Sequence, residues 1–348
     1  MEHITSGMEN LAKILVTGGA GFIGCALVRH LITQTEHAVV NVDNLTYASK
    51  LAALDSVASS ETYTFERADI CDLELMTKIL NRYQPDVIAH LAAESHVDRS
   101  IQQPKAFIEA NIVGTYNVLE AARRYWSELS DGKESSFRFL HVSTDEVFGD
   151  LLAGEVESTE ESPYRPSSPY AASKAASDHL VRAWHRTFGL PVLVTNCSNN
   201  YGPFQFHEKL IPLCIKNALG GKPIPLYGDG NQVRDWIHVE DHVRALVKII
   251  ERGRVGGTYN IGGSNPRKNI EVVTMLCRAL DQLVVQHPVG IERFEQNITF
   301  VQDRPGHDTR YAVDTSKLQN ELGWSPLIDF ADGLKETAEW FLADQKNG

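Results

Sequence analysis

The sequence predicts an α/β protein: a Rossmann-type, doubly wound parallel sheet with a smaller, interleaved C-terminal lobe. In the first half of the chain, near-continuous apolar strands alternate with helical segments, as in parallel sheets that helices cover on both faces. A glycine-rich turn joins the first strand to the first helix, where Rossmann-type sheets carry one. Beyond about residue 198, short segments with proline and glycine dominate. We therefore expect one large sheet domain and a second lobe of loops, helices and minor strands.

The expected elements follow one another in order. Short apolar runs typical of buried strands lie at 13–18, 38–43, 63–69, 87–93, 137–144 and 191–197. Helical segments lie between them at 21–34, 72–83, 104–126 and 170–189. Pro104 suits an early helical position, and Gly189 suits a helix end. The segments 239–251 and 257–263 are expected to return to the large sheet, so the two lobes interleave.

These elements divide the chain into two expected domains. The sheet domain is expected to span 13–197 and to include 236–263, while the second lobe spans 198–235 and 264–340. Residues 1–12 carry Glu2 and Glu9 and lack an apolar core, which argues against a signal peptide. They are expected to form a flexible tail before the first strand. A run of about 18 uncharged apolar residues is missing from the sequence, which argues against a membrane-spanning helix.

Composition and charge limit the classes of function. The 348 residues are 43% hydrophobic and 22% charged, as in soluble globular proteins. The formal net charge of −12 argues against a general affinity for nucleic acids or anionic membranes. The cysteines are widely spaced, without a C-x-x-C or Cys/His metal spacing: Cys25, Cys71, Cys197, Cys214 and Cys277. We therefore expect reduced thiols, no bound metal and a cytoplasmic location.

The turn "VTGGAGFIG" places Gly18, Gly21 and Gly24 between the first expected strand and helix. Glycines there let the backbone approach a pyrophosphate, which binds at the helix N-terminus. Asp43 ends the second expected strand, 19 residues after Gly24, where an acid binds ribose hydroxyls and repels the additional phosphate of NADP. The stretch "DNLTYAS" contains no Arg or Lys. We therefore expect NAD as the cofactor; the alternative is a glycine-rich turn and a strand-end aspartate without a ligand.

The G-x-x-G-x-x-G spacing resembles the short-chain dehydrogenase/reductase superfamily, whose Y-x-x-x-K motif is matched by Tyr170 and Lys174 in "YAASK". Four residues apart on a helix, these side chains share a face. A nearby ammonium and a positive nicotinamide ring both favour the phenolate, which makes the phenol a base near neutral pH. Thr144, at the end of a strand, would bind the same sugar oxygen. The alternative is a buried tyrosine beside an unrelated surface lysine.

Two adjacent acids, Asp145 and Glu146, follow that strand in "VSTDEVFGD". On their own they are typical of a solvated turn. Beside a tyrosine, lysine and NAD centre they fit a specific chemistry. Once a sugar C4 alcohol has been oxidised to a ketone, the C5 proton is acidic, and loss of water across C5 and C6 needs one base and one acid. The hydride then returns to C6, so no net oxidation occurs.

Longer stretches closely resemble the dTDP-glucose 4,6-dehydratases, extended members of that superfamily: "VSTDEVFG", "LAAESHVDRSI", "NNYGPFQFHEKLIP", "GDGNQVRDWIHVEDH" and "DRPGHDTRYA". The resemblance runs from about Lys13 to the 330s. It implies conversion of dTDP-glucose to a 4-keto-6-deoxy sugar in deoxysugar biosynthesis. It also implies a homodimer built on the helices near 104–126 and 170–189.

The resemblance also implies a role for each catalytic residue. Asp145 is the acid toward the C6 hydroxyl, and Glu146 is the base at C5. Tyr170 accepts the C4 hydroxyl proton. Lys174 tunes Tyr170 and holds the nicotinamide ribose, while Thr144 orients the sugar oxygen.

Binding residues complete the expected site. The cofactor residues are Gly18, Gly21, Phe22, Ile23, Gly24, Asp43, Asn44, Leu45, Thr46, Asp69, Ile70, Leu91, Ala92, Ala93, Glu94, Ser95, Ala110, Tyr170, Lys174 and Asn200. The substrate residues are Ser95, Thr144, Asn199, Lys209, Leu210, Pro225, Leu226, Tyr227, Arg234, Asn269, Arg304 and His307. Among these, Arg234 and Arg304 are suited to gripping phosphate oxygens. Ala110 stands where the family usually has a threonine.

Other functions stay open at this stage. A UDP-sugar 4,6-dehydratase would keep the chemistry and change the nucleotide. A 4-epimerase or a UDP-glucuronate decarboxylase would share the glycines and Y-x-x-x-K but would need no acid–base pair for removing water. A non-catalytic NAD-sensing regulator would have no reason to keep Tyr170, Lys174 and both acids. The expected partner is a nucleotide sugar, with no nucleic acid or membrane.

Overall fold

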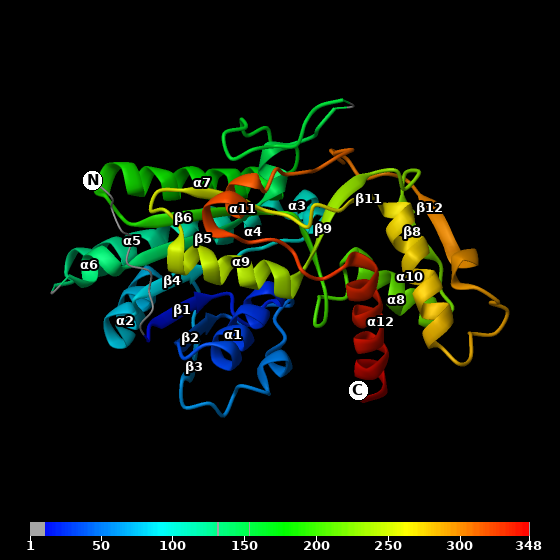
Figure 1. The fold of residues 1–348 in the computed structure, drawn as a ribbon, viewed down its shortest axis with the longest axis horizontal. Helices are drawn as coiled ribbons and strands as arrows, with labels where there is room; N and C mark the ends of the chain where they lie inside the picture. Colours follow the sequence, from blue (N-terminus) through cyan, green and yellow to red (C-terminus); the bar gives the residue numbers. More distant parts are fainter. Residues whose placement is uncertain (1–10, 131, 153, 348) are drawn as a thin grey trace.

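A parallel sheet forms the centre of the molecule (Figure 1). The computed structural model describes residues 11–130, 132–152 and 154–347; residues 1–10, most of the predicted tail, lie outside the described part. The strands of the sheet are β1 (Lys13–Thr17), β2 (Ala38–Asp43), β3 (Tyr63–Arg67), β4 (Val87–His90), β5 (Arg138–Thr144), β6 (Val192–Cys197) and β10 (Thr258–Ile261). Their order is β10-β6-β5-β4-β1-β2-β3, and every neighbouring pair is parallel. The predicted fold class is confirmed.

Helices cover both faces of this sheet because alternate strand residues point to opposite sides. In β1, Ile14 and Val16 belong to one core with α1 (Phe22–Gln34) and α9 (Val239–Arg252). Leu15 belongs to the other core, with α2 (Leu73–Tyr83), α5 (Thr115–Ser127) and α7 (Pro169–Phe188). The strands are apolar on both faces for this reason, as the sequence pattern indicated.

Helix ends are set by local capping. Asp72 begins α2, and its side chain accepts a hydrogen bond from the Leu75 backbone N–H. Ser168 begins α7 in the same way, through the Ala171 N–H, and Pro169 occupies the first helical position. Gly189 ends α7 with a φ of 78°, a left-handed conformation that glycine adopts without strain.

The segment predicted as one helix over 104–126 is divided in three. Between α4 (Pro104–Phe107) and α5, residues Ile108–Gly114 form a π-helical segment, η2. Its wider turn carries Asn111, whose side chain accepts from the Glu94 N–H and donates to Ser173 Oγ of α7. Those contacts are tertiary, so apolar periodicity could not predict the interruption. Such segments are frequent at functional sites.

The second lobe has its own small sheets and core (Figure 1, right). One sheet contains β7 (Asn199–Tyr201), β9 (Val233–His238) and β11 (Pro266–Lys268), and the other pairs β8 (Ile224–Tyr227) with β12 (Ile298–Val301). Helices α8 (Leu210–Leu219), α10 (Asn269–Leu283) and α12 (Phe330–Asn347) enclose its core. The chain thus leaves the large sheet after β6 and rejoins it at β10.

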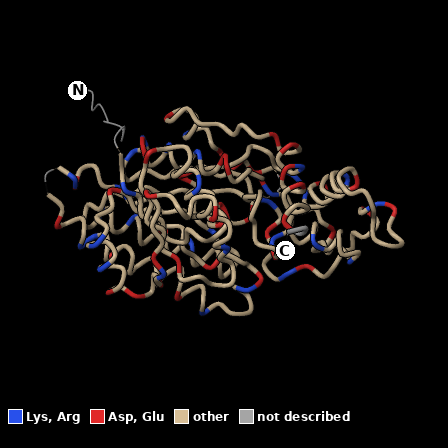
Figure 2. The backbone as a smooth tube through the Cα atoms, turned by 90° about the horizontal axis from the view of Figure 1, so that it is seen from below, with Lys and Arg blue, Asp and Glu red and all other residues tan. Residues whose placement is uncertain are grey.

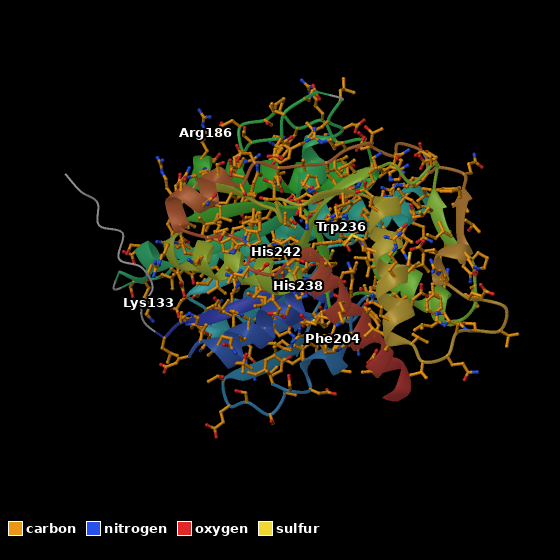
Figure 3. The ribbon with its side chains drawn as sticks, turned by 45° about the vertical axis from the view of Figure 1, so that its right-hand side comes forward. Lys133, Arg186, Phe204, Trp236, His238 and His242 are labelled. Atoms are coloured by element: carbon orange, nitrogen blue, oxygen red, sulfur yellow. The ribbon has the colours of Figure 1, made fainter. Side chains whose placement is uncertain are left out.

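The two lobes are joined through polar and aromatic contacts. Trp236, His238 and His242 lie along the junction in Figure 3. His242 of α9 forms a 2.9 Å hydrogen bond with Asn200 of β7, and the Arg29 guanidinium of α1 lies 4.5 Å from the centre of the Phe204 ring. These contacts fix the position of β7, which contributes to the site described below.

Charges and cysteines agree with the expectations from composition. Acidic and basic residues are interspersed along the whole backbone in Figure 2. The five cysteines all lie in described segments and are free thiols. Among the helices of the described residues, none combines the length and apolarity that crossing a bilayer requires.

Candidate active site

A large cavity lies at the carboxyl ends of β1, β2, β4, β5 and β6, the edge where open α/β sheets bind ligands. Its volume is about 770 Å³. Every predicted cofactor residue except Leu45 lines it, as do the predicted residues Thr144, Asp145, Glu146, Asn199, Lys209 and Leu210. Residues from both lobes therefore meet in one cavity.

The glycine turn forms a cradle that a side chain would fill. A Cβ on Gly24 would lie 2.1 Å from the Gly18 carbonyl oxygen, and one on Gly18 would lie 2.7 Å from the Ala92 backbone. Gly21 begins α1, and within the described chain no side chain caps this helix. Its first N–H groups thus remain for an anion, as a pyrophosphate site requires. The residues fit a dinucleotide.

Asp43 organises the loop beside this cradle. One carboxylate oxygen accepts from the Leu45 N–H at 2.8 Å and from Ser49 Oγ at 2.9 Å, and the other accepts from the Ala20 N–H at 3.0 Å. Leu45 itself, at a φ of 61°, lies outside the cavity lining. A carboxylate can accept about four hydrogen bonds, so Asp43 retains capacity for a ribose hydroxyl. The ribose roles of both residues stay predictions.

The predicted catalytic residues converge on the cavity wall. Thr144 ends β5, and its hydroxyl accepts from the Glu146 N–H, so it caps the short 3₁₀ turn η3 (Asp145–Phe148) that holds both acids. Tyr170 and Lys174 reach the cavity from the first turns of α7. The Lys174 ammonium donates a 2.9 Å hydrogen bond to the Val142 carbonyl on β5. The end of β5 and the start of α7 therefore present their polar groups to the same cavity.

The two acids differ in their electrostatic surroundings. Burial raises the pKa of Asp145 well above its usual range, and the charges of Glu146 and Asp235 raise it further. Burial also raises the pKa of Glu146, but the positive charges of Arg304, Arg234 and Lys209 oppose this rise. Burial thus favours the protonated form of both acids, and the charges of Arg304 and Lys209 favour the carboxylate form of Glu146, which is the form that a base requires.

Several buried polar atoms in the described part of the site lack a hydrogen-bond partner. Among the described residues, Asp145 Oδ2, Glu146 Oε2 and Asn199 Oδ1 have no hydrogen-bond partner. Buried groups without partners are costly, so they are expected to face a bound molecule. All three residues line the cavity.

The reactivity of Tyr170 depends on the charges around its phenol. Burial raises the pKa of its phenol well above the ordinary value, and the charge of Glu146 raises it further, while a hydrogen bond with Thr144 lowers it. The phenolate therefore needs additional positive charge before it can act near neutral pH. An oxidised nicotinamide ring in the cavity would provide it.

The second-lobe substrate residues divide into two groups. Lys209 lines the cavity and donates a 2.8 Å hydrogen bond to the Ser95 carbonyl. Tyr227 and Arg304 both hydrogen-bond to Asp98, at 3.0 and 3.4 Å, and the His307 ring lies 5.9 Å from that of Tyr227. The residues outside the cavity lining are Pro225, Leu226, Tyr227, Arg234, Asn269, Arg304 and His307. Their substrate contacts stay predictions.

Sequence reasoning missed several residues of the site. Ser49 lines the cavity and holds Asp43, and Gln205 lines it and donates to the Asn200 carbonyl at 2.7 Å. Asp235 is 2% exposed and raises the pKa of Asp145. The sequence could have indicated Asp235, because an acid inside the apolar strand "VRDWIH" requires a buried partner. No spacing rule marks Ser49 or Gln205.

Fold and site together define a class. A Rossmann-type sheet, a glycine cradle at the first helix, and a Tyr/Lys pair facing a strand-end threonine are the parts of a short-chain dehydrogenase/reductase site. The family model described as GDP-mannose 4,6 dehydratase matches residues 15–337. The chain belongs to this dehydratase family, and within it to the dTDP-glucose 4,6-dehydratases.

Curated relatives support that placement. A dTDP-glucose 4,6-dehydratase of Neisseria meningitidis serogroup B is 59% identical over 332 residues, which cover 95% of this chain and 94% of that protein. A dTDP-glucose 4,6-dehydratase of Escherichia coli is 58% identical over 342 residues, with 96% and 94% covered. The similarity therefore extends over nearly the whole of both chains.

Solved structures show the same fold. A dTDP-glucose 4,6-dehydratase from Streptomyces venezuelae, crystallised with NAD and TYD, has a TM-score of 0.86 at 42% identity and covers 96% of this chain and 98% of its own. A UDP-glucose 4-epimerase from Thermotoga maritima reaches 0.81 at 28% identity, with 96% and 99% covered. The fold is thus shared with an epimerase, so the fold alone does not distinguish the two chemistries.

Proposed function

We propose that this chain is an NAD-dependent dTDP-glucose 4,6-dehydratase, which converts dTDP-glucose to dTDP-4-keto-6-deoxyglucose. The observation that carries the proposal is the Asp145–Glu146 pair on the wall of a cavity that also contains Tyr170 and Lys174. Residues 13–197 and 236–263 would hold NAD, while 198–235 and 264–340 would hold the nucleotide sugar. The boundary at 235 falls within β9.

The first step is oxidation at C4. Tyr170 accepts the proton of the C4 hydroxyl, and Thr144 holds the same oxygen. Lys174 stabilises the phenolate by its charge and would also hold the nicotinamide ribose. Bound NAD supplies the chemistry of taking the C4 hydride and returning it later to C6.

The second step is loss of water. Glu146 removes the C5 proton, which the C4 ketone has made acidic, and Asp145 protonates the C6 hydroxyl so that it leaves as water. When hydride returns to C6, a proton is restored at C5. The raised pKa of Asp145 favours its protonated form, which is the form that a general acid requires.

An epimerase or decarboxylase on the same fold would use Tyr170, Lys174 and NAD alone. It would gain nothing from a buried acid–base pair, whose desolvation is costly. Incubation with dTDP-glucose, and separately with UDP-glucose, without added reductant tests the proposal by mass spectrometry. We expect a product lighter by one water from dTDP-glucose. A product of unchanged mass would instead indicate epimerisation, and faster turnover of UDP-glucose would change the assigned nucleotide.

Replacing Asp145 by asparagine removes the acid that protonates the leaving hydroxyl. We expect water loss to slow by roughly 10²-fold, the lower end for general acid catalysis, because a water molecule can partly substitute. Rapid-quench measurement of the 4-keto product checks this. Dehydration at the original rate would contradict the role given to Asp145.

A homodimer is part of the proposal. Tyr116 of α5 and Trp184 and Phe188 of α7 form a row of aromatic contacts at 5.9 and 5.6 Å, yet Tyr116 is 41% and Phe188 45% exposed. Ile108, 48% exposed, extends this apolar area along η2. A second copy would cover these side chains with the same helices.

Phe188→Asp should therefore convert the protein to a monomer. Sedimentation velocity of the unsubstituted chain should give a dimer. Phe300→Asp, on the 59% exposed Phe300 of β12, is the matched control and should leave the dimer intact. A monomeric unsubstituted chain, or a Phe188→Asp dimer, would place the interface elsewhere.

We also propose a cytoplasmic location. Cys25, Cys197 and Cys214 are buried free thiols, and Cys71 is an exposed one. Free thiols of both kinds persist in a reducing compartment.

A further inference from the structure

A buried acid behind the catalytic lysine is not used by the mechanism above. Asp178 lies on α7 four residues after Lys174, so both side chains project from the same helix face. Asp178 is completely buried and Lys174 is 4% exposed. Two opposite charges are thus enclosed in the core one helical turn apart, and Asp178 lies outside the cavity lining.

Asp178 is the centre of a hydrogen-bond network. Its Oδ1 accepts from His141 Nε2 on β5 at 3.1 Å, and its Oδ2 accepts from the Tyr164 hydroxyl at 2.8 Å and from Asn196 Nδ2 on β6 at 3.1 Å. Asn196 Nδ2 also donates to the Thr144 carbonyl at 3.2 Å. Both oxygens of the carboxylate therefore accept hydrogen bonds, and Asn196 links the carboxylate to the backbone of Thr144.

The same network is adjacent to the lysine. Lys174 donates to the carbonyl of Val142, the residue after His141. The Lys174 ammonium has this carbonyl as its only hydrogen-bond partner in the described chain. A buried ammonium with one neutral partner would lose its proton readily. The carboxylate one helical turn away supplies the charge that prevents this.

We propose that Asp178 is a positioning residue for the oxidation step: it is the buried counter-charge that keeps Lys174 protonated, and through Asn196 it anchors Thr144. The inference rests on the proposed function and extends it to a residue that touches neither substrate nor cofactor. It predicts that the negative charge of Asp178, more than its shape, sets the pH range of C4 oxidation.

The charges around the pair are consistent with this role. Burial would raise the pKa of Asp178, but the hydrogen bond from His141 and the charge of Lys174 outweigh it and lower the pKa. Burial lowers the pKa of Lys174, and the Asp178 charge opposes that fall. His90 and His141 on β4 and β5 are held neutral by burial, which lowers the pKa of both, that of His141 to about 4.

Two further groups face the network. Burial raises the pKa of Cys197 on β6 to about 12, so its thiol is neutral. Arg182, one turn beyond Asp178 on α7, donates to the Tyr164 hydroxyl at 2.7 Å. Arg182 is only partly buried, whereas Lys174 is 4% exposed, so Lys174 is the buried cation beside Asp178 on α7.

Asp178→Asn tests the proposal. The rate of NADH formation on mixing NAD-loaded protein with dTDP-glucose is measured against pH. Loss of the buried negative charge of Asp178 lowers the pKa of Lys174, so the falling limb of the pH profile, which reports Lys174, should move to lower pH by about one unit. The KM for dTDP-glucose and the Kd for NAD, measured by fluorescence quenching, should stay unchanged.

Two comparison variants separate charge from packing. Asp178→Glu retains the charge, and Tyr164→Phe removes one hydrogen bond to it; both should keep the pH limits of the unsubstituted protein even if their kcat falls. Equal loss of rate at all pH values in Asp178→Asn, without a shift, would overturn the proposal. So would a shift in Asp178→Glu as large as that in Asp178→Asn.

Folding and function have separate readouts. If Asp178→Asn does not fold, Asp178→Ser, which also removes the charge, is measured in its place: a shift of about one unit in the pH limit supports the proposal, and an unmoved limit overturns it. Failure of the proposed function would appear differently, as no NADH formation by the unsubstituted protein with dTDP-glucose.

Discussion

Replacement of Tyr170 by phenylalanine should abolish reduction of bound NAD by dTDP-glucose, with a loss of at least about 10³-fold in the rate of NADH formation. Tyr170 is the group that accepts the C4 hydroxyl proton, and without that acceptor the hydride cannot leave C4. The variant should still fold, because the hydroxyl is the only atom removed. Stopped-flow absorbance of NADH on mixing with substrate measures the effect.

A matched control is Tyr125→Phe. Tyr125 is a buried tyrosine of α5 in the core beneath the sheet, and its hydroxyl donates to the Pro85 carbonyl away from the cavity. This variant should form NADH at the original rate, whatever its stability. Normal turnover by Tyr170→Phe would show that Tyr170 is not the base in C4 oxidation. This site would then not work like other Tyr/Lys sites.

Replacement of Glu146 by glutamine should separate the two halves of the reaction. Oxidation at C4 uses Tyr170 and should continue, but removal of the C5 proton needs a carboxylate and should slow by roughly 10²–10⁴-fold. Bound NADH should therefore accumulate with a 4-keto sugar that retains its C6 hydroxyl. Rapid quench followed by mass spectrometry identifies that intermediate, and absorbance follows the NADH.

The exposed Glu128 at the end of α5 gives a control, Glu128→Gln, which should release the dehydrated product at the original rate. Two outcomes for Glu146→Gln would contradict the division of roles. The variant could fail to form NADH, as Tyr170→Phe does, or it could dehydrate substrate normally. In the latter case another group would be the base at C5.

Local sequence patterns predicted the parts of the fold that local physics controls. The limits of α2 and α7 follow from Asp72, Ser168 and Gly189, whose capping needs only neighbouring residues. The break at Ile108–Gly114 depends on Asn111 meeting Glu94 and Ser173, which belong to distant segments. Periodicity within one segment has no access to such contacts.

In the site, too, short-range patterns could be predicted and contacts between distant segments could not. The spacing of Gly18, Gly21 and Gly24 and that of Tyr170 and Lys174 are short-range patterns, and the structure places them all on one cavity. The electrostatic difference between Asp145 and Glu146 arises from Asp235 and from Arg304 and Lys209, all three of the second lobe. Adjacent residues in the sequence thus acquire different proton affinities only after the lobes meet.

The late return of the chain to the large sheet has a consequence during synthesis on the ribosome. Strand β6 pairs with β10, whose residues follow β6 by about 60 positions, so a nascent chain exposes the β6 edge until Ile261 has emerged. An open edge of buried, apolar composition invites pairing with other chains. Truncated translation products that end before β10 should therefore aggregate, and chaperone demand should peak in this window of elongation.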